Sequence, residues 1–392
     1  MPAPETDPST SITPRTQPVV PPIYQTVNFR LDENSYDDIR ATGGLNEYWY
    51  SRFGNPTVDA AGAEIARLEG AEAGLMTSSG MAAVAVVLLT LLKAGDRLVA
   101  ARELYGDTRD LLERDLRQLG ITVDLVGAAD LDSWRQAVGR APVAVLYAES
   151  ISNPQLRLLD VPALADLARG AAARLVVDNT FATPLLIRPL EHGADVVIDS
   201  VTKFLNGHSD VTAGCISSGR AHIQQFQRRV ITLGGSLDPH AAFLVSRALR
   251  TVRLRLDRQM STAARVAQFL KSRPDVEDVI YPGLAAYPQR ELAARLLPAG
   301  RAGGMVTFVV QGGNQRGYDM MRRLRVLTEA TSLGGVETLV SMPITSSQFN
   351  LSEKELTEAG IPPGMVRLSI GIEEPEDILS DLAQALDASR RP

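Results

Sequence analysis

Seven short apolar runs, separated by helical stretches, constrain the fold of this chain more than any other feature. Each run is almost continuously apolar rather than alternating, and amphipathic segments such as 161–172 lie between them. The runs are GLMTS (74–78), DRLVAA (96–101), ITVDLV (121–126), PVAVLYA (142–148), RLVVD (174–178), ADVVI (194–198) and AGCISS (213–218). Continuous apolar strands are typical of a parallel sheet covered on both faces. We therefore expect an α/β fold with a mostly parallel, doubly wound sheet, whose ligands bind beyond the carboxyl ends of the strands.

The segments on either side of this region predict two further parts. Residues 1–58 are expected to form an extended arm, because the prolines of PVVPPIYQTVNF prevent a helix. Such an arm is either disordered or docked on a partner subunit. Residues 59–250 form the large domain, and 251–392 a smaller α+β domain. A single long helix over 246–272 should connect the two domains, and the smaller one should contain strands near GGMVTFVV (303–310) and MVRLSI (365–370).

Composition excludes several classes of protein. With 45% apolar and 22% charged residues, the 392-residue chain can bury a large core, and its net charge of −6 contains no block of like charges. This argues against nucleic acid or an anionic membrane as partner. One cysteine and four histidines without metal-ligand spacing argue against disulfides and against any metal site. The N-terminus lacks a signal-peptide layout, and the longest apolar stretch, 81–92, is too short for a membrane helix, so we expect a soluble cytoplasmic protein.

Polar residues follow the ends of five of the predicted strands. They are Ser79 and Gly80, Tyr105, Asn153, Asp178 with Asn179 and Thr180, and Ser200 with Thr202 and Lys203. A doubly wound sheet would bring all of these positions to one crevice.

Each of these features has an ordinary structural alternative. The Ser79–Gly80 turn before a helix is a ready anion site, but it is also common helix capping. A buried Asp178 needs a cationic partner or hydrogen bonds, so it either faces a protonated pyridine nitrogen or forms a structural cap or ion pair. Lys203 is either a strand-end lysine that reaches solvent or a cleft amine with a lowered pKa that acts as a nucleophile. Taken together, an anion cradle, a carboxylate, the aromatic face of Tyr105 and an amine match pyridoxal 5'-phosphate (PLP).

The chain resembles the Cys/Met-metabolism, or transsulfuration, family of PLP-dependent enzymes from PPIYQT (21–26) to RLSIGIE (367–373). The family includes cystathionine γ-synthase, cystathionine γ-lyase, methionine γ-lyase and homoserine sulfhydrylases. The resemblance rests on YSRFGNPT (50–57), SSGMAA (78–83), LYGDT (104–108), ESISNP (149–154), DNTFATP (178–184), SVTKFLNGHSD (200–210), SLGGVETL (332–339) and RLSIGIE.

The resemblance implies an aspartate-aminotransferase-like fold (PLP fold type I) and a role for each site residue. Lys203 would bind PLP covalently and move protons, Asp178 would pair with its pyridinium nitrogen, and Tyr105 would stack on its ring and assist the leaving group. The other expected cofactor-binding residues are Gly80, Met81, Thr180, Ser200 and Thr202, together with Tyr50 and Arg52 from the neighbouring subunit. The expected substrate-binding residues are Arg367, which clamps the α-carboxylate, with Ser332, Asn153 and Tyr50. A shared site implies a homo-oligomer, usually a tetramer built from two catalytic dimers.

The activity implied is γ-elimination on a sulfur- or oxygen-substituted homoserine-type amino acid, giving a 2-oxo acid, ammonia and the released thiol. γ-Replacement, in which a thiol adds at Cγ, is the alternative in the same site, and it includes a specialised secondary-metabolic γ-substitution. Two other classes stay open: a binding protein that keeps the fold without turnover, and an aminotransferase. The presence of Lys203, Asp178, Tyr105 and Arg367 argues against the first of these.

Three positions depart from the pattern of the family. Thr331 stands where many cystathionine-handling members have Glu, Asp107 where many have Gly or Cys, and Ser346 where a His is common. Asp107 is either a solvated loop residue or a charge that selects a polar or cationic substrate tail. We interpret His208 as structural, and the arginines at 247, 250, 253, 255 and 258 as a solvated or interface helix face.

Overall fold

A computed structural model describes residues 18–349 and 351–389, and it contains two sheets. The larger has seven strands in the order β1-β7-β6-β5-β4-β2-β3. The strands are β1 (Ala73–Thr77), β2 (Arg97–Ala101), β3 (Thr122–Val126), β4 (Val145–Glu149), β5 (Arg174–Asp178), β6 (Val196–Asp199) and β7 (Gly214–Ser218). Every residue of β4, β6 and β7 is buried, so both faces of the sheet centre are covered, as the continuous apolar runs predict.

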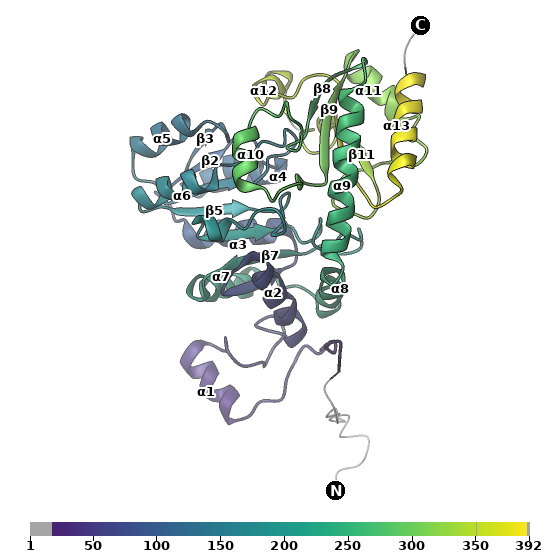
Figure 1. Ribbon diagram of the computed structural model, residues 1–392. Helices are drawn as coiled ribbons and strands as arrows, with labels where there is room; N and C mark the ends of the chain where they lie inside the picture. Colours follow the sequence, from purple (N-terminus) through teal and green to yellow (C-terminus); the bar gives the residue numbers. More distant parts are fainter. Residues whose placement is uncertain (1–17, 350, 390–392) are drawn as a thin grey trace.

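Helices before, between and after these strands pack around the sheet (Figure 1). They are α2 (Pro56–Glu69), α3 (Gly80–Leu91), α4 (Gly106–Asp110), the π-helical η2 (Leu111–Leu116), α5 (Leu131–Arg140), α6 (Val161–Gly170), the 3₁₀ turn η3 (Pro189–His192) and α7 (Arg220–Leu233). The amphipathic segment 161–172 is thus confirmed as a helix. One strand departs from the parallel arrangement, because β7 runs antiparallel to both β1 and β6. No helix lies between β6 and β7, so the chain turns back directly instead of crossing over.

The smaller sheet has the order β10-β11-β12-β9-β8 and lies wholly after residue 250. Its strands are β8 (Val276–Ile280), β9 (Met305–Val310), β10 (Thr328–Glu329), β11 (Leu339–Ser341) and β12 (Met365–Ser369). Its helices are α10 (Arg290–Leu296), α11 (Gly313–Met321), the 3₁₀ turn η4 (Pro343–Thr345), α12 (Glu353–Glu358) and α13 (Pro375–Ala388). The two strands expected near 303–310 and 365–370 are confirmed as β9 and β12. The domain limits at 58 and 250 remain a prediction.

The single helix expected over 246–272 is wrong. The segment is divided into α8 (Pro239–Leu249) and α9 (Val252–Lys271). Arg255 accounts for the break: its guanidinium is buried, and it donates to the carbonyl of Ala248 and to those of Phe204 and Leu205. The carbonyl of Ala248 is thereby engaged outside a continuous helix. Arg255 is therefore also an exception to the predicted solvated arginine face.

The extended arm is only partly extended. Residues 18–32 are extended and mostly exposed, but α1 (Glu33–Thr42) follows them (Figure 1). Local chemistry explains this helix. Asp32 and Ser35 form a capping box at its start, and Gly43 ends it in a left-handed conformation with φ of 79°. The prolines and aromatic residues of 19–29 exclude a helix within that stretch, but they do not exclude one in the residues that follow it.

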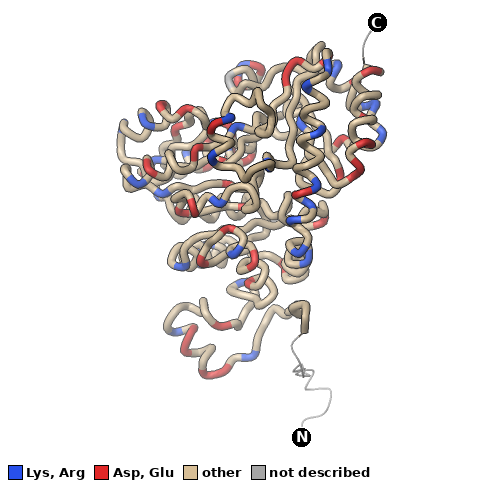
Figure 2. Tube along the Cα trace, viewed as in Figure 1, with Lys and Arg blue, Asp and Glu red and all other residues tan. Residues whose placement is uncertain are grey.

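Basic and acidic residues are interspersed along the Cα trace (Figure 2). Over residues 18–349 and 351–389 there is no helix whose length and apolar character would suffice to cross a bilayer.

Candidate active site

A cavity of about 430 Å³ lies where the carboxyl ends of the large sheet face the smaller one. The residues that follow the ends of β1, β2, β4, β5 and β6 meet there, as the sheet topology predicts. Of the predicted site residues, the cavity is lined by Gly80, Met81, Tyr105, Asn153, Asp178, Thr180, Ser200, Thr202, Lys203, Ser332 and Arg367.

The amine of Lys203 lies within this cavity rather than in bulk solvent. Its Nζ donates a hydrogen bond of 2.8 Å to Oγ of Ser332, which is held in place by a left-handed backbone with φ of 76°. Burial, with a smaller effect from the positive charge of Arg367, lowers the pKa of Lys203 to about 8. An amine with this pKa is partly neutral near pH 7, and only the neutral form is a nucleophile.

Asp178 ends β5 and accepts a hydrogen bond of 2.9 Å from the backbone N–H of Thr180. Burial raises the pKa of Asp178, and the hydrogen bonds from Thr180 only partly offset this. Asp178 forms no ion pair within the described residues. A buried carboxylate without a cation is costly, so this position suits a ligand that brings a positive charge to it.

Glu149 lies next to Asp178 in the sheet, where the two residues are register partners on β4 and β5. Its Oε1 accepts a hydrogen bond of 2.6 Å from the backbone N–H of Tyr105, and its buried Oε2 has no partner in the described chain. Burial and then the charge of Asp178 raise the pKa of Glu149 well above its ordinary value. Two adjacent acids cannot both ionise cheaply, so Glu149 is the one that keeps its proton.

The start of α3 provides an anion-binding end to the cavity. Ser79 caps the helix by accepting from the N–H of Ala82, while helix geometry leaves the N–H groups of Gly80 and Met81 without partners in the helix. A Cβ at Gly80 would lie 2.8 Å from the side chain of Ser200, so only glycine permits this approach. The same turn can therefore cap the helix through Ser79 and also bind a phosphate through its remaining N–H groups.

Arg367 projects from β12 into the cavity. Its guanidinium donates to Oδ1 of Asn153 and to the carbonyl oxygen of Ser332, each at 3.0 Å. Burial lowers the pKa of Arg367 to about 10, which still leaves it charged at neutral pH. A fixed, buried guanidinium suits a small carboxylate ligand.

Tyr105 follows β2 and is half-exposed at the mouth of the cavity. Its hydroxyl donates a hydrogen bond of 2.7 Å to Oδ2 of Asp107. Burial, and then the hydrogen bond and charge of Asp107, raise the pKa of Tyr105 to about 12.

Two predicted residues do not line this cavity. Arg52 donates to the carbonyl of Ile231 at 2.7 Å and packs over the rings of Tyr50 and Phe53. Tyr50 pairs with Asn28 in an isolated bridge. Both belong to the segment assigned above to a neighbouring subunit's site.

Several lining residues were not predicted from the sequence: Thr108, Glu149, Phe181, Thr212 and Ser347. Ser79, which was expected at the crevice, also lines the cavity. Glu149 carried a usable signal, because it ends an apolar strand run just as Asp178 does. Thr331 and Ser346, two of the departures from the family pattern, also line the cavity.

Comparison with known proteins agrees with this geometry. Residues 8–387 match the family described as Cys/Met metabolism PLP-dependent enzyme. The chain belongs to this family. It is therefore a PLP-dependent enzyme of the transsulfuration group, with PLP fold type I. It is 39% identical over 373 residues to L-methionine γ-lyase of Pseudomonas putida, covering 95% of this chain and 93% of that protein.

Two solved structures extend the comparison for this PLP-dependent enzyme. Cystathionine γ-synthase from Xanthomonas oryzae pv. oryzae superposes with a TM-score of 0.89 at 36% identity, covering 95% of this chain and 93% of the other. A Campylobacter jejuni protein, provisionally described as O-acetylhomoserine (thiol)-lyase, superposes with a TM-score of 0.88 at 29% identity and covers 94% and 95%. That structure contains a pyridoxyl-lysine monophosphate. In the present chain, the glycine approach at Gly80, the uncompensated Asp178 and the amine of Lys203 fit the phosphate, ring nitrogen and carbonyl of this cofactor.

Proposed function

We propose that this enzyme catalyses γ-elimination on an amino acid of the homoserine or homocysteine type that carries a sulfur or oxygen substituent at Cγ. The products would be a 2-oxo acid, ammonia and the released thiol or oxygen compound. One observation carries the proposal: a single cavity holds the amine of Lys203, the uncompensated carboxyl of Asp178 and the guanidinium of Arg367.

Each end of the cavity would hold a different part of the cofactor. The N–H groups of Gly80 and Met81, with the hydroxyls of Ser200 and Thr202, would bind the phosphate. Thr180 holds two of the neighbouring residues in place. Its N–H donates to Asp178, and its hydroxyl accepts from the N–H of Ser200 at 2.8 Å.

Asp178 would keep the ring nitrogen protonated, and Tyr105 would lie against the ring. When bound there, PLP withdraws electrons from the carbon atoms of the attached amino acid.

The chain's own residues would handle the substrate and its protons. Arg367, with Asn153, would hold the α-carboxylate and so fix the orientation of Cα. Lys203, once released from the cofactor, is an amine with a pKa lowered to about 8, so it could take the Cα proton and later one from Cβ. Tyr105 keeps its proton because its pKa is raised to about 12, and it could give that proton to the leaving group.

The direct test uses cofactor-loaded enzyme and several substrates. Methionine, cystathionine, homocysteine and O-acylhomoserines are incubated separately, and 2-oxobutanoate and ammonia are quantified. Lys203→Ala should abolish turnover, whereas Lys271→Ala, which removes a surface lysine paired with Asp278, should not. Absence of 2-oxobutanoate from every substrate would contradict γ-elimination.

γ-Replacement is the second candidate, and the 0.89 TM-score to a cystathionine γ-synthase favours it. The same residues would serve, and the outcome would depend on whether a thiol adds at Cγ or the carbon skeleton is hydrolysed to the 2-oxo acid. Adding cysteine to the O-acylhomoserine incubations and quantifying thioether product separates the two reactions.

We also propose that the active site is completed by a second copy of the chain, within a dimer of catalytic dimers. In support, the arm presents exposed apolar side chains, including Val19, Ile23, Tyr24 and Val27. Tyr50 and Arg52 would reach the phosphate of the neighbouring subunit, with Tyr50 also near its substrate. Mixing inactive Arg52→Ala with inactive Lys203→Ala should restore activity, because mixed dimers would contain one intact site. Persistent inactivity of the mixture would contradict a shared site.

A further inference from the structure

We propose that Asp107 both holds the hydroxyl of Tyr105 and selects substrates whose γ-substituent ends in a cationic group. This rests on the proposed γ-carbon reaction and narrows its substrate class. The juxtaposition that carries it is the 2.7 Å bond from the Tyr105 hydroxyl to Oδ2 of Asp107 at the mouth of the cavity.

The position of this bond relates Asp107 to the substrate tail. Arg367 and Lys203 line the same cavity, where Arg367 would hold the α-carboxylate and the α-amino group would lie at the cofactor site beside Lys203. The γ-substituent must then extend toward the mouth, where Tyr105 lies. Asp107 does not itself line the cavity, but it is one hydrogen bond away from a residue that does.

No cation of the described residues neutralises the charge of Asp107. The nearby Arg109 is engaged by Glu113 at 2.6 Å and by Glu355 at 3.4 Å. Within the described residues, the carboxylate of Asp107 forms no ion pair, and its only side-chain hydrogen bond is the one from Tyr105. An exposed anion with open acceptor capacity favours a cationic donor and repels an anionic tail.

Three further residues that line the cavity are neutral. Thr331, Ser346 and Ser347 supply hydroxyls, and the hydroxyl of Ser346 already donates to the carbonyl of Met342 at 2.7 Å. None of these side chains is a cation that could bind a tail carboxylate. The selectivity therefore depends on one charge, that of Asp107.

A cationic tail would also change the state of Tyr105. In the free enzyme the phenolic proton is directed to Asp107. A substrate ammonium that takes up the carboxylate would compete for this acceptor and leave the Tyr105 hydroxyl available to face the γ-substituent. Recognition of the tail and release of Tyr105 would thus be one event.

The test compares two substrates that differ in one group. S-(2-aminoethyl)-L-homocysteine and S-propyl-L-homocysteine have tails of equal length, and only the first has a terminal ammonium. We expect kcat/KM of wild type to favour the aminoethyl compound about tenfold, the worth of one charge-assisted hydrogen bond. Asp107→Asn should bring the ratio close to one, while Asp132→Asn, which removes an exposed carboxylate on α5, should leave it unchanged.

The same ratio is measured as dissociation constants in the Lys203→Ala background, which cannot complete either γ-carbon reaction. Selectivity can then be judged even if γ-elimination is not the reaction of this enzyme. A wild-type preference for the propyl compound, or a ratio that Asp107→Asn leaves unchanged, would overturn the proposal.

Discussion

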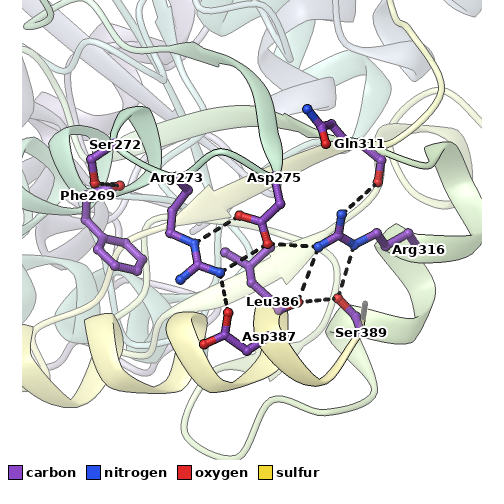
Figure 3. A network of polar contacts seen from close by, with 9 residues as sticks. All are labelled: Phe269, Ser272, Arg273, Asp275, Gln311, Arg316, Leu386, Asp387 and Ser389. Carbon is purple, nitrogen blue, oxygen red and sulfur yellow. Dashed lines mark hydrogen bonds and ion pairs between the residues drawn. The ribbon is translucent and has the colours of Figure 1, made fainter. Parts of the chain in front are cut away.

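Two groups of carboxylates in this protein differ in whether a cationic side chain lies beside them. Glu69 on α2 and Glu149, Asp178 and Asp199 on the larger sheet form no ion pair in the described chain. Glu69, Glu149 and Asp199 are buried, and Glu149 and Asp178 line the cavity. Asp275, at the far end of the smaller sheet, is also almost buried but lies between two arginines (Figure 3). Arg273 bonds it at 3.0 and 3.1 Å, and Arg316 at 2.8 Å.

The pKa values diverge accordingly. Burial raises the pKa of each of these four acids, and the charge of a neighbouring acid adds to the rise at Glu149 and Asp199. Burial also acts on Asp275, but the hydrogen bonds and charge of Arg273, with Arg316, lower its pKa to about 2. Asp178 in the cavity therefore has room for the positive charge of a ligand, whereas Asp275 already has two arginines beside it.

Loss of charge at Asp178 should have the largest effect. Asp178→Asn keeps the shape but removes the anion that faces the ring nitrogen, and removing one partner of a buried pair costs about 3–5 kcal/mol. We expect kcat/KM to fall by a factor on the order of a hundred to a few thousand, with little change in thermal midpoint. Steady-state kinetics on folded, cofactor-saturated protein tests this, and a variant with near wild-type activity would contradict the role of Asp178.

The same substitution at Asp275 should give the reverse pattern. Asp275→Asn leaves Arg273 and Arg316 without their shared carboxylate, so we expect a loss of about 3 kcal/mol in stability. Activity of the folded enzyme should stay near wild type, because this network is remote from the cavity. Denaturant unfolding followed by circular dichroism gives the stability, and an unchanged midpoint would show that the network stabilises nothing.

The two groups should also differ in the sign of their pH dependence. Burial raises the pKa of Glu69 from an ordinary 4.5 to about 7, so the folded state holds a proton that the unfolded state releases. Its stabilising contribution is present below pH 4.5 and is lost as the pH rises toward 7. The pKa of Asp275 is lowered, so its contribution is present above about pH 4 and is lost as the pH falls toward 2.

The free energy of unfolding should therefore fall by about 2 kcal/mol less in Glu69→Gln than in wild type between pH 5 and 7. The amide still accepts from Asn179, as Oε1 of Glu69 does at 2.8 Å, and does not titrate. Thermal unfolding across this pH range measures the slope, with cofactor kept saturating and Glu64→Gln on the same helix as control. A slope equal to that of wild type would mean that Glu69 is not the group that titrates.

The smallest effect is expected at Glu149. Because Glu149 keeps its proton beside Asp178, Glu149→Gln replaces one neutral acceptor of the Tyr105 N–H by another. We expect kcat/KM within about fivefold of wild type, or about 1 kcal/mol. Glu149→Ala, which leaves that N–H unpaired, should cost more. A hundredfold loss of kcat/KM in the Gln variant would show that Glu149, like Asp178, is ionised in the working enzyme.

The sequence predicted the larger sheet, the smaller sheet and most of the cavity for one physical reason. Continuous apolar runs can be stable only as strands covered on both faces, and topology then brings their carboxyl ends together. Asp178, Ser200 and Lys203 line one cavity because each lies at, or a few residues after, the carboxyl end of such a run. The strength of this reasoning is that it needs only the order of residues along the chain.

Tertiary structure decided what the order of residues could not. The break between α8 and α9 depends on Arg255, whose partners Phe204 and Leu205 are fifty residues away. The raised pKa of Glu149 depends on its burial and on Asp178 in the neighbouring strand. The hydroxyl of Tyr105 donates to Asp107 because of the local fold at the start of α4. Charge state and orientation depend on distances between side chains, and a sequence fixes these distances only after the chain has folded.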